Sequence, residues 1–90
     1  MITKLVKKVN EKIEVNGECR LIVTIDDSKT GLQFTSTITT DSMEHIGTSI
    51  EFTTDCLTNT IGTDCEVSYN EFEGEYIFAY ETQRITVTLL

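Results

Sequence analysis

The sequence has no proline and no tryptophan, one histidine, and three cysteines among its 90 residues. Because no stretch has the Pro-, Gly- or Ser-rich composition of an interdomain linker, we treat residues 1–90 as a single domain. The cysteines are odd in number and lie far apart, which does not fit a disulfide framework. Isolated cysteines of this kind are typical of a reducing compartment.

Long hydrophobic runs are also missing. No apolar segment approaches the roughly 18 residues that a membrane-spanning helix requires. The residues after Met1 do not form a signal core either, because lysines interrupt them. We therefore expect a cytoplasmic protein without a membrane partner.

Basic residues are scarce. The chain carries fifteen acidic side chains against seven basic ones, a net charge of −8. Residues 1–20 hold five bases and three acids (+2), whereas residues 21–90 hold two bases and twelve acids (−10). Such a field repels nucleic acid and anionic membranes and favours encounters with a basic protein. The alternative interpretation is that the acidity only keeps a small protein soluble.

Motifs for catalysis, metals or cofactors are absent too. His45 is the only candidate base, and Cys19, Cys56 and Cys65 lie in or beside apolar patterns. One histidine and three cysteines match the ligand count of a zinc site, but neither a CxxC nor an HxxxH spacing occurs. No glycine-rich phosphate loop is present. We therefore expect no enzymatic activity, no metal and no cofactor.

Three segments in the first half show clear periodicity. Residues 2–13 repeat apolar side chains at steps of three and four, which predicts an amphipathic helix that stops near Gly17. Residues 18–26 and 32–40 alternate apolar and polar side chains and flank the turn residues "DDSKTG". They predict a β-hairpin whose second strand carries a row of threonines on one face.

Residues 42–61 allow two interpretations. Met43, Ile46 and Ile50 fall within a narrow arc of a helical projection together with Leu57 and Ile61, and Asp41 with Glu44 resembles a capping box. Gly47 and several threonines argue against a helix, and "IEF" at 50–52 is compatible with the start of a strand. We favour the helix. On it, Phe52 points about 180° away from Met43, toward solvent.

The last third reads as β structure. The segments "CEVSYN", "EYIFAYE" and "RITVTLL" alternate and are joined by short connections. The predicted order is therefore α-β-β-α-β-β-β. The simplest assembly is an α+β fold, a single two-layer domain in which an antiparallel sheet of about five strands carries two helices on one face.

Acidic and aromatic residues crowd together at residues 69–81, "YNEFEGEYIFAYE". The acidic residues 71–75 form the tip of a predicted hairpin, and Tyr76, Phe78 and Tyr80 share one face of the following strand. A stripe of rings is more often core than surface. Ile77 and Ala79 make the opposite face apolar as well, so an exposed stripe stays possible.

The charge layout predicts a partner-binding surface on hairpin tips and strands. Its candidate residues are Asp26, Asp27, Glu51, Phe52, Asp55, Glu71, Phe72, Glu73 and Glu75. Carboxylates at such positions can occupy the lysine and arginine side chains with which a partner holds nucleic acid.

In size, charge and lack of motifs the chain resembles the small acidic inhibitors of bacterial viruses, such as anti-CRISPR proteins, restriction inhibitors and inhibitors of uracil-DNA glycosylase. The resemblance implies a phage or mobile-element inhibitor of a nucleic-acid-handling enzyme, acting in the host bacterial cell by nucleic-acid mimicry. No residue roles follow from it. The alternative is a structural or assembly subunit of a virion or protein complex. Such a subunit would self-associate, for example as a homodimer, through sheet edges or exposed rings.

Overall fold

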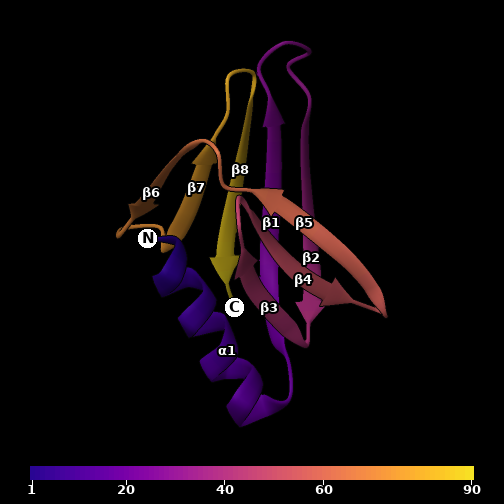
Figure 1. Cartoon of the computed structure of the whole chain (residues 1–90). Helices are drawn as coiled ribbons and strands as arrows, with labels where there is room; N and C mark the ends of the chain where they lie inside the picture. The colour runs from indigo at the N-terminus through magenta and orange to yellow at the C-terminus, as the bar shows by residue number, and fades with distance from the viewer.

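The computed structural model describes all residues from 1 to 90 as one helix and eight strands (Figure 1). The elements follow one another as α1 (Ile2–Asn16), β1 (Cys19–Asp27), β2 (Gln33–Thr40), β3 (Ser42–Ile46), β4 (Ser49–Thr54), β5 (Leu57–Gly62), β6 (Glu66–Asn70), β7 (Glu75–Ala79) and β8 (Gln83–Leu89). No helix is long and apolar enough to cross a membrane.

Helix α1 confirms the helix predicted from the apolar spacing and extends it by three residues. Its apolar face is anchored by Leu5 and Val9, which are fully buried. The helix ends because Gly17 adopts a left-handed conformation with φ of 81°, and its amide N–H donates to the Ile13 carbonyl at 2.7 Å. A glycine at this position avoids the steric cost that a β-carbon would bring.

The five strands predicted from alternation are confirmed, and they form one antiparallel sheet in the order β2-β1-β8-β7-β6. Cross-strand partners share a face, so Leu21, Val87 and Tyr76 line the inner side of three neighbouring strands. Tyr76 and Phe78 are buried, which confirms that this ring stripe is core.

The helix predicted over residues 42–61 is wrong. The segment forms strands β3, β4 and β5, which make a second antiparallel sheet in that order. Gly47 turns β3 into β4 with a φ of 57°, and Asp55 and Cys56 turn β4 into β5 with φ of 48° and 67°. Two-residue turns with positive φ match the right-handed twist of the paired strands. The turn at Asp55-Cys56 lacks the Asn-Gly signal that would have revealed it.

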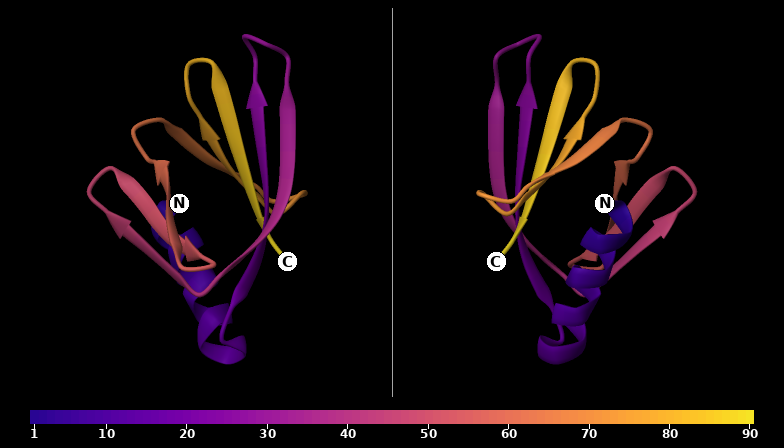
Figure 2. Two further views of the ribbon diagram at one scale, coloured as in Figure 1. Left: turned by 90° about the vertical axis from the view of Figure 1, so that its right-hand side faces the viewer. Right: turned by 90° about the vertical axis from the view of Figure 1, so that its left-hand side faces the viewer.

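The predicted architecture, two helices on one face of a sheet, is therefore wrong as well. Helix α1 and the three-stranded sheet both lie on the inner side of the five-stranded sheet, and the two sheets diverge from a common base (Figure 2). All three elements contribute to one core, whose buried apolar residues are Leu5, Val9, Cys19, Leu21, Met43, Ile50, Phe52, Ile61, Tyr76, Phe78 and Val87. The three-stranded sheet therefore covers the inner side of the five-stranded sheet, where a second helix was predicted.

Two hydroxyl groups connect the sheets. Thr40, at the end of β2, is fully buried, and its Oγ1 lies 2.8 Å from the carbonyl oxygens of both Ser42 and Thr53. At the far end of the small sheet, the Tyr80 hydroxyl donates to the Gly62 carbonyl. Burial, with a smaller contribution from the neighbouring Cys65 thiol, raises the pKa of Tyr80 to about 12, so the hydroxyl remains a donor at neutral pH.

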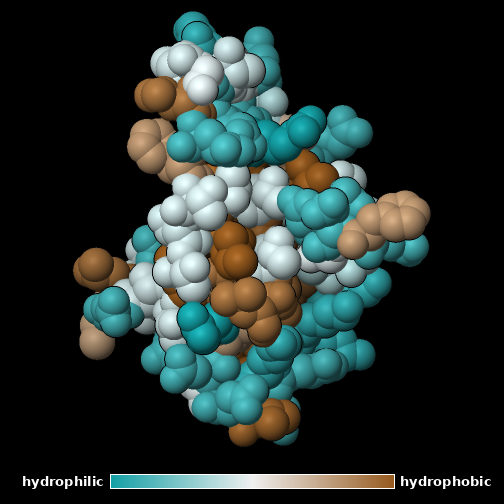
Figure 3. Space-filling model, turned by 180° about the vertical axis from the view of Figure 1, so that it is seen from behind, coloured by the Kyte–Doolittle hydropathy of each residue, from teal (hydrophilic) through white to brown (hydrophobic).

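The outer face of the five-stranded sheet is not covered by any other element. Neighbouring strands place six threonines on it: Thr24, Thr35, Thr37, Thr39, Thr86 and Thr88. In Figure 3 this face is pale, with a few apolar side chains at its centre and hydrophilic ones around it. The same register places Asp26, Glu66 and Glu75 on this face, near the ends of their strands.

Candidate protein-binding surface

The predicted partner-binding residues lie on separate parts of the molecule. Asp26 and Asp27 end β1, Asp55 lies in the β4–β5 turn, residues 71–74 form the connection from β6 to β7, and Glu75 begins β7. These three hairpin ends point in different directions in Figure 1. The structure thus does not bring the candidates together into one acidic face.

Phe52 is not part of the surface. The helical projection placed its ring toward solvent, but Phe52 lies on β4 opposite Met43 and is only 6% exposed. The prediction of an exposed ring is wrong because a strand alternates its side chains with a period of two. The same alternation puts Glu51 on the outer side of the small sheet, half-buried, directly opposite Glu44. Like charges directly opposite each other destabilise a strand pair.

The carboxylates are not neutralised by ion pairs. No lysine or arginine nitrogen lies within 4.0 Å of any side-chain carboxylate of the chain. Four of the seven basic residues are lysines of α1, and two of them, Lys4 and Lys8, lie near Tyr69, just before the acidic β6–β7 turn, without pairing with its carboxylates. The charge asymmetry read from the sequence therefore persists in three dimensions, with a field that salt bridges do not cancel.

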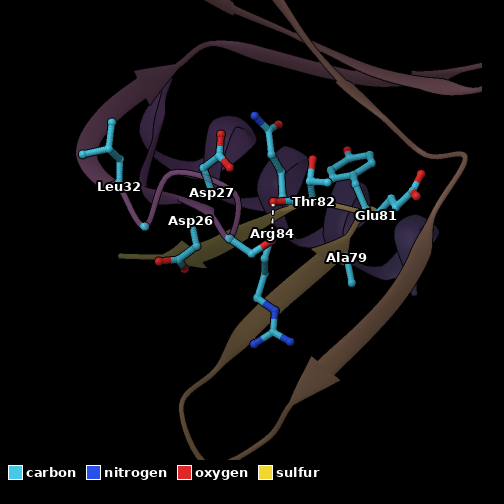
Figure 4. A pocket seen from close by; sticks show the side chains of 11 residues that line it. Asp26, Asp27, Leu32, Ala79, Glu81, Thr82 and Arg84 are labelled. Atoms are coloured by element: carbon cyan, nitrogen blue, oxygen red, sulfur yellow. Dashed lines mark hydrogen bonds between the residues drawn. The ribbon is translucent and has the colours of Figure 1, made fainter.

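At the end of β1, the Asp27 side chain has a structural role. Asp27 accepts hydrogen bonds from the amides of Lys29 and Thr30, at 2.9 and 3.4 Å, and so fixes the β1–β2 turn. Ser28 joins this turn to the β7–β8 connection through the Thr82 carbonyl. The hollow between them, of about 440 Å³, appears in Figure 4, where the labelled carboxylates diverge rather than converge. This geometry does not favour a cation site.

The β6–β7 turn has a different character. Phe72 is 102% exposed, so its ring makes almost no contact with the rest of the protein. It lies between Glu71 and Glu73, both exposed. The turn is nevertheless ordered, because the Asn70 side-chain oxygen accepts the amide hydrogens of Phe72 and Glu73 at 3.1 and 3.3 Å. The Gly74 amide closes the turn by donating to the Asn70 carbonyl at 2.8 Å.

The Glu71-Phe72-Glu73 tip combines an exposed ring with a backbone that hydrogen bonds hold in place. Burial of the Phe72 ring in an apolar pocket of a partner would remove its apolar surface from water, which is favourable. The Asn70 hydrogen bonds reduce the conformational freedom that binding would otherwise remove. Sequence reasoning selected Phe72 but overlooked Asn70, although an asparagine at the start of a turn is a known signal for this geometry.

The cysteines are not arranged for nucleophilic chemistry. Cys19 is buried, Cys65 is half-buried and Cys56 is exposed, and all three are free. Burial raises the thiol pKa of Cys19 and of Cys65, which disfavours the reactive thiolate. His45 lies exposed on β3, and no three histidine, cysteine or acidic side chains are grouped as metal ligands.

No family model, curated protein or solved structure matches this chain.

Proposed function

We propose that the chain is a non-enzymatic protein-binding module whose Glu71-Phe72-Glu73 tip docks into a basic partner. The observation that carries the proposal is the fully exposed Phe72 ring on a turn that Asn70 holds in place. Aromatic side chains that enter a pocket supply a large share of interface free energy. The two flanking carboxylates have no basic neighbour of their own and are free to meet lysine or arginine at the rim of that pocket.

The partner that fits this chemistry is a nucleic-acid-handling enzyme. Such enzymes hold phosphates with lysine and arginine side chains, to which a carboxylate also binds. An acidic module seated on that surface would exclude the nucleic acid, as expected for an inhibitor of phage or mobile-element origin that acts in the host cytoplasm. The net charge of −8 supports such an encounter and disfavours direct binding of nucleic acid by this chain.

A capture experiment with matched variants tests this proposal. The tagged protein is incubated with a bacterial lysate at low salt, and bound proteins are eluted with a salt gradient. We expect a basic nucleic-acid-binding protein among them, and we expect Phe72→Ala to reduce its capture about tenfold or more, as loss of an interface anchor does. The double variant Glu71→Gln/Glu73→Gln should shift its elution to lower salt because fewer ion pairs hold it.

The chain offers close controls for both changes. Phe34 is also an exposed phenylalanine, 62% exposed, but it lies on β2, so Phe34→Ala should leave capture unchanged. Glu14→Gln/Glu18→Gln changes the net charge by the same amount at the other end of the molecule. Equal losses with the control and tip variants would refute docking through the tip and leave only non-specific charge.

Self-association is a second candidate function, and one observation favours it. Strand β2 is an edge of the five-stranded sheet, and residues 32–40 contain no charged side chain. An uncharged, exposed edge lacks the usual protection against pairing with another chain. If this edge has an assembly role, the mass from light scattering should rise to that of a dimer as concentration increases, and Ser36→Lys should keep it monomeric. A constant monomer mass at all concentrations would reject this candidate.

A further inference from the structure

A cavity of about 590 Å³ lies between α1 and the strands β6, β7 and β8. Its volume falls in the range of small-molecule sites. The helix contributes Lys8, Lys12 and Val15 to its lining, and the strands contribute Tyr69, Tyr76 and Leu89. The cavity reaches the β6–β7 turn at Gly74 but is not lined by the Glu71-Phe72-Glu73 tip itself.

The hydroxyl of Tyr76 has no hydrogen-bond partner. The Tyr76 side chain is 2% exposed, and its hydroxyl oxygen is the one buried side-chain polar atom in the chain that is left unpaired. Buried polar groups in native proteins are nearly always satisfied, so an exception calls for a specific explanation. Burial raises the pKa of this hydroxyl, with a smaller effect from Tyr69, so it is protonated and able to donate. A ligand that offers an acceptor would satisfy it.

Positive charge surrounds the same cavity. The Nζ atoms of Lys4 and Lys8 lie 4.9 and 5.9 Å from the centre of the Tyr69 ring. The Nζ of Lys12, which also lines the cavity, donates to the main-chain oxygen of Leu90 at 2.5 Å. Glu11 is the only acid in the lining, against two lysines. An acceptor that carries negative charge therefore fits this site better than a neutral one.

Apolar surface completes the site. Val15 is exposed, and Leu89 and Tyr69 are half-buried, so they offer apolar surface in the lining that also holds the lysines. The Tyr69 and Tyr76 rings pack against each other with centroids 4.7 Å apart. A ring-bearing ligand can bury its body on this surface while its charged end faces the lysines.

We propose that this cavity binds a small anionic molecule with an aromatic body, whose acidic group accepts a hydrogen bond from Tyr76 and lies near Lys8 and Lys12. Because the hydroxyl presents almost no surface to solvent, the ligand reaches it only when side chains that line the cavity move aside. The cavity adjoins the β6–β7 turn, because Gly74 lines it, but it uses other side chains than the tip, and either proposal can fail without the other.

A pair of fluorescent probes tests the proposal. One is 8-anilinonaphthalene-1-sulfonate, which is anionic and aromatic; the other is N-phenyl-1-naphthylamine, which has the same rings without the sulfonate. We expect saturable binding of one sulfonate probe per chain and at least tenfold weaker binding of the neutral probe. Tyr76→Phe should raise the dissociation constant of the sulfonate probe about fivefold, the worth of one ordinary hydrogen bond. Lys8→Gln should raise it as well.

Two controls separate loss of the binding site from loss of stability and from a general effect of charge. Tyr76→Phe removes an unpaired hydroxyl, so its melting temperature should equal or exceed that of the wild type while probe binding weakens. Lys7→Gln removes the same charge from the same helix at an exposed residue outside the cavity lining, and it should bind the probe normally. The proposal is overturned if Tyr76→Phe binds like the wild type, if Lys7→Gln loses as much as Lys8→Gln, or if the neutral probe binds equally well.

Discussion

Replacing Phe78 with alanine is expected to lower the free energy of unfolding by about 3–5 kcal/mol, the usual range for a large ring removed from a packed core. Phe78 is 0% exposed and lies on β7, between Val67 of β6 and Ile85 of β8. Its removal takes apolar contacts from the middle of the five-stranded sheet and leaves a cavity that flanking strands cannot fill. Urea unfolding followed by circular dichroism measures the change.

Phe72→Ala is the matched control, because it deletes the same atoms from a ring that contacts almost nothing. Substitutions at such exposed positions usually change stability by less than about 0.5 kcal/mol. Two equal losses would show that the ring of Phe72 packs against the protein in solution. That result would also remove the main support for the docking tip.

The second large effect is expected at Thr40, where the chain passes from one sheet to the other. Valine has nearly the shape of threonine but lacks the hydroxyl, so Thr40→Val leaves the carbonyls of Ser42 and Thr53 without their shared donor. Loss of a partner at a fully buried site costs about 1–3 kcal/mol. Denaturant unfolding should therefore show a lower midpoint with an unchanged slope.

Hydrogen exchange locates the effect of this change. Because Thr40 joins β2 to β3 and β4, amides of the three-stranded sheet should exchange faster in Thr40→Val, and those of β7 and β8 should change less. Thr37→Val makes the same substitution on the open face of β2 and should have little effect. Uniform loss of protection in both sheets would contradict a local role for Thr40.

The elements with one clear period were predictable from the sequence. Helix α1 has its apolar residues at helical spacing and a glycine at its end, and the strands of the large sheet alternate over at least five residues. Residues 42–61 were wrongly predicted as a helix because the spacing of Met43, Ile46 and Ile50 matches one face of a helix by coincidence. In the structure Met43 and Ile50 face the core from different strands, whereas Ile46 points outward. Two short strands with a tight turn between them mimic helical spacing.

The candidate surface was predictable only in part. The exposed Phe72 followed from its position at a hairpin tip, while the buried Phe52 did not, because its orientation depends on the secondary structure that was misassigned. The unpaired hydroxyl of Tyr76 could not be foreseen at all. Whether a buried hydroxyl has a partner depends on contacts between residues far apart in the chain, and no local pattern records them.

The pairing of β1 with β8 has a consequence for how the protein is made. Asp27 lies opposite Gln83 and Leu21 opposite Leu89, so the partners are 56 to 68 residues apart in sequence (83 − 27 and 89 − 21). Closing such long loops slows folding. During synthesis on the ribosome, the β1–β2 hairpin emerges soon after α1, and one side of β1 stays unpaired until β8 has been made. Nascent chains are therefore most exposed to misassociation, and most in need of chaperones, in this interval.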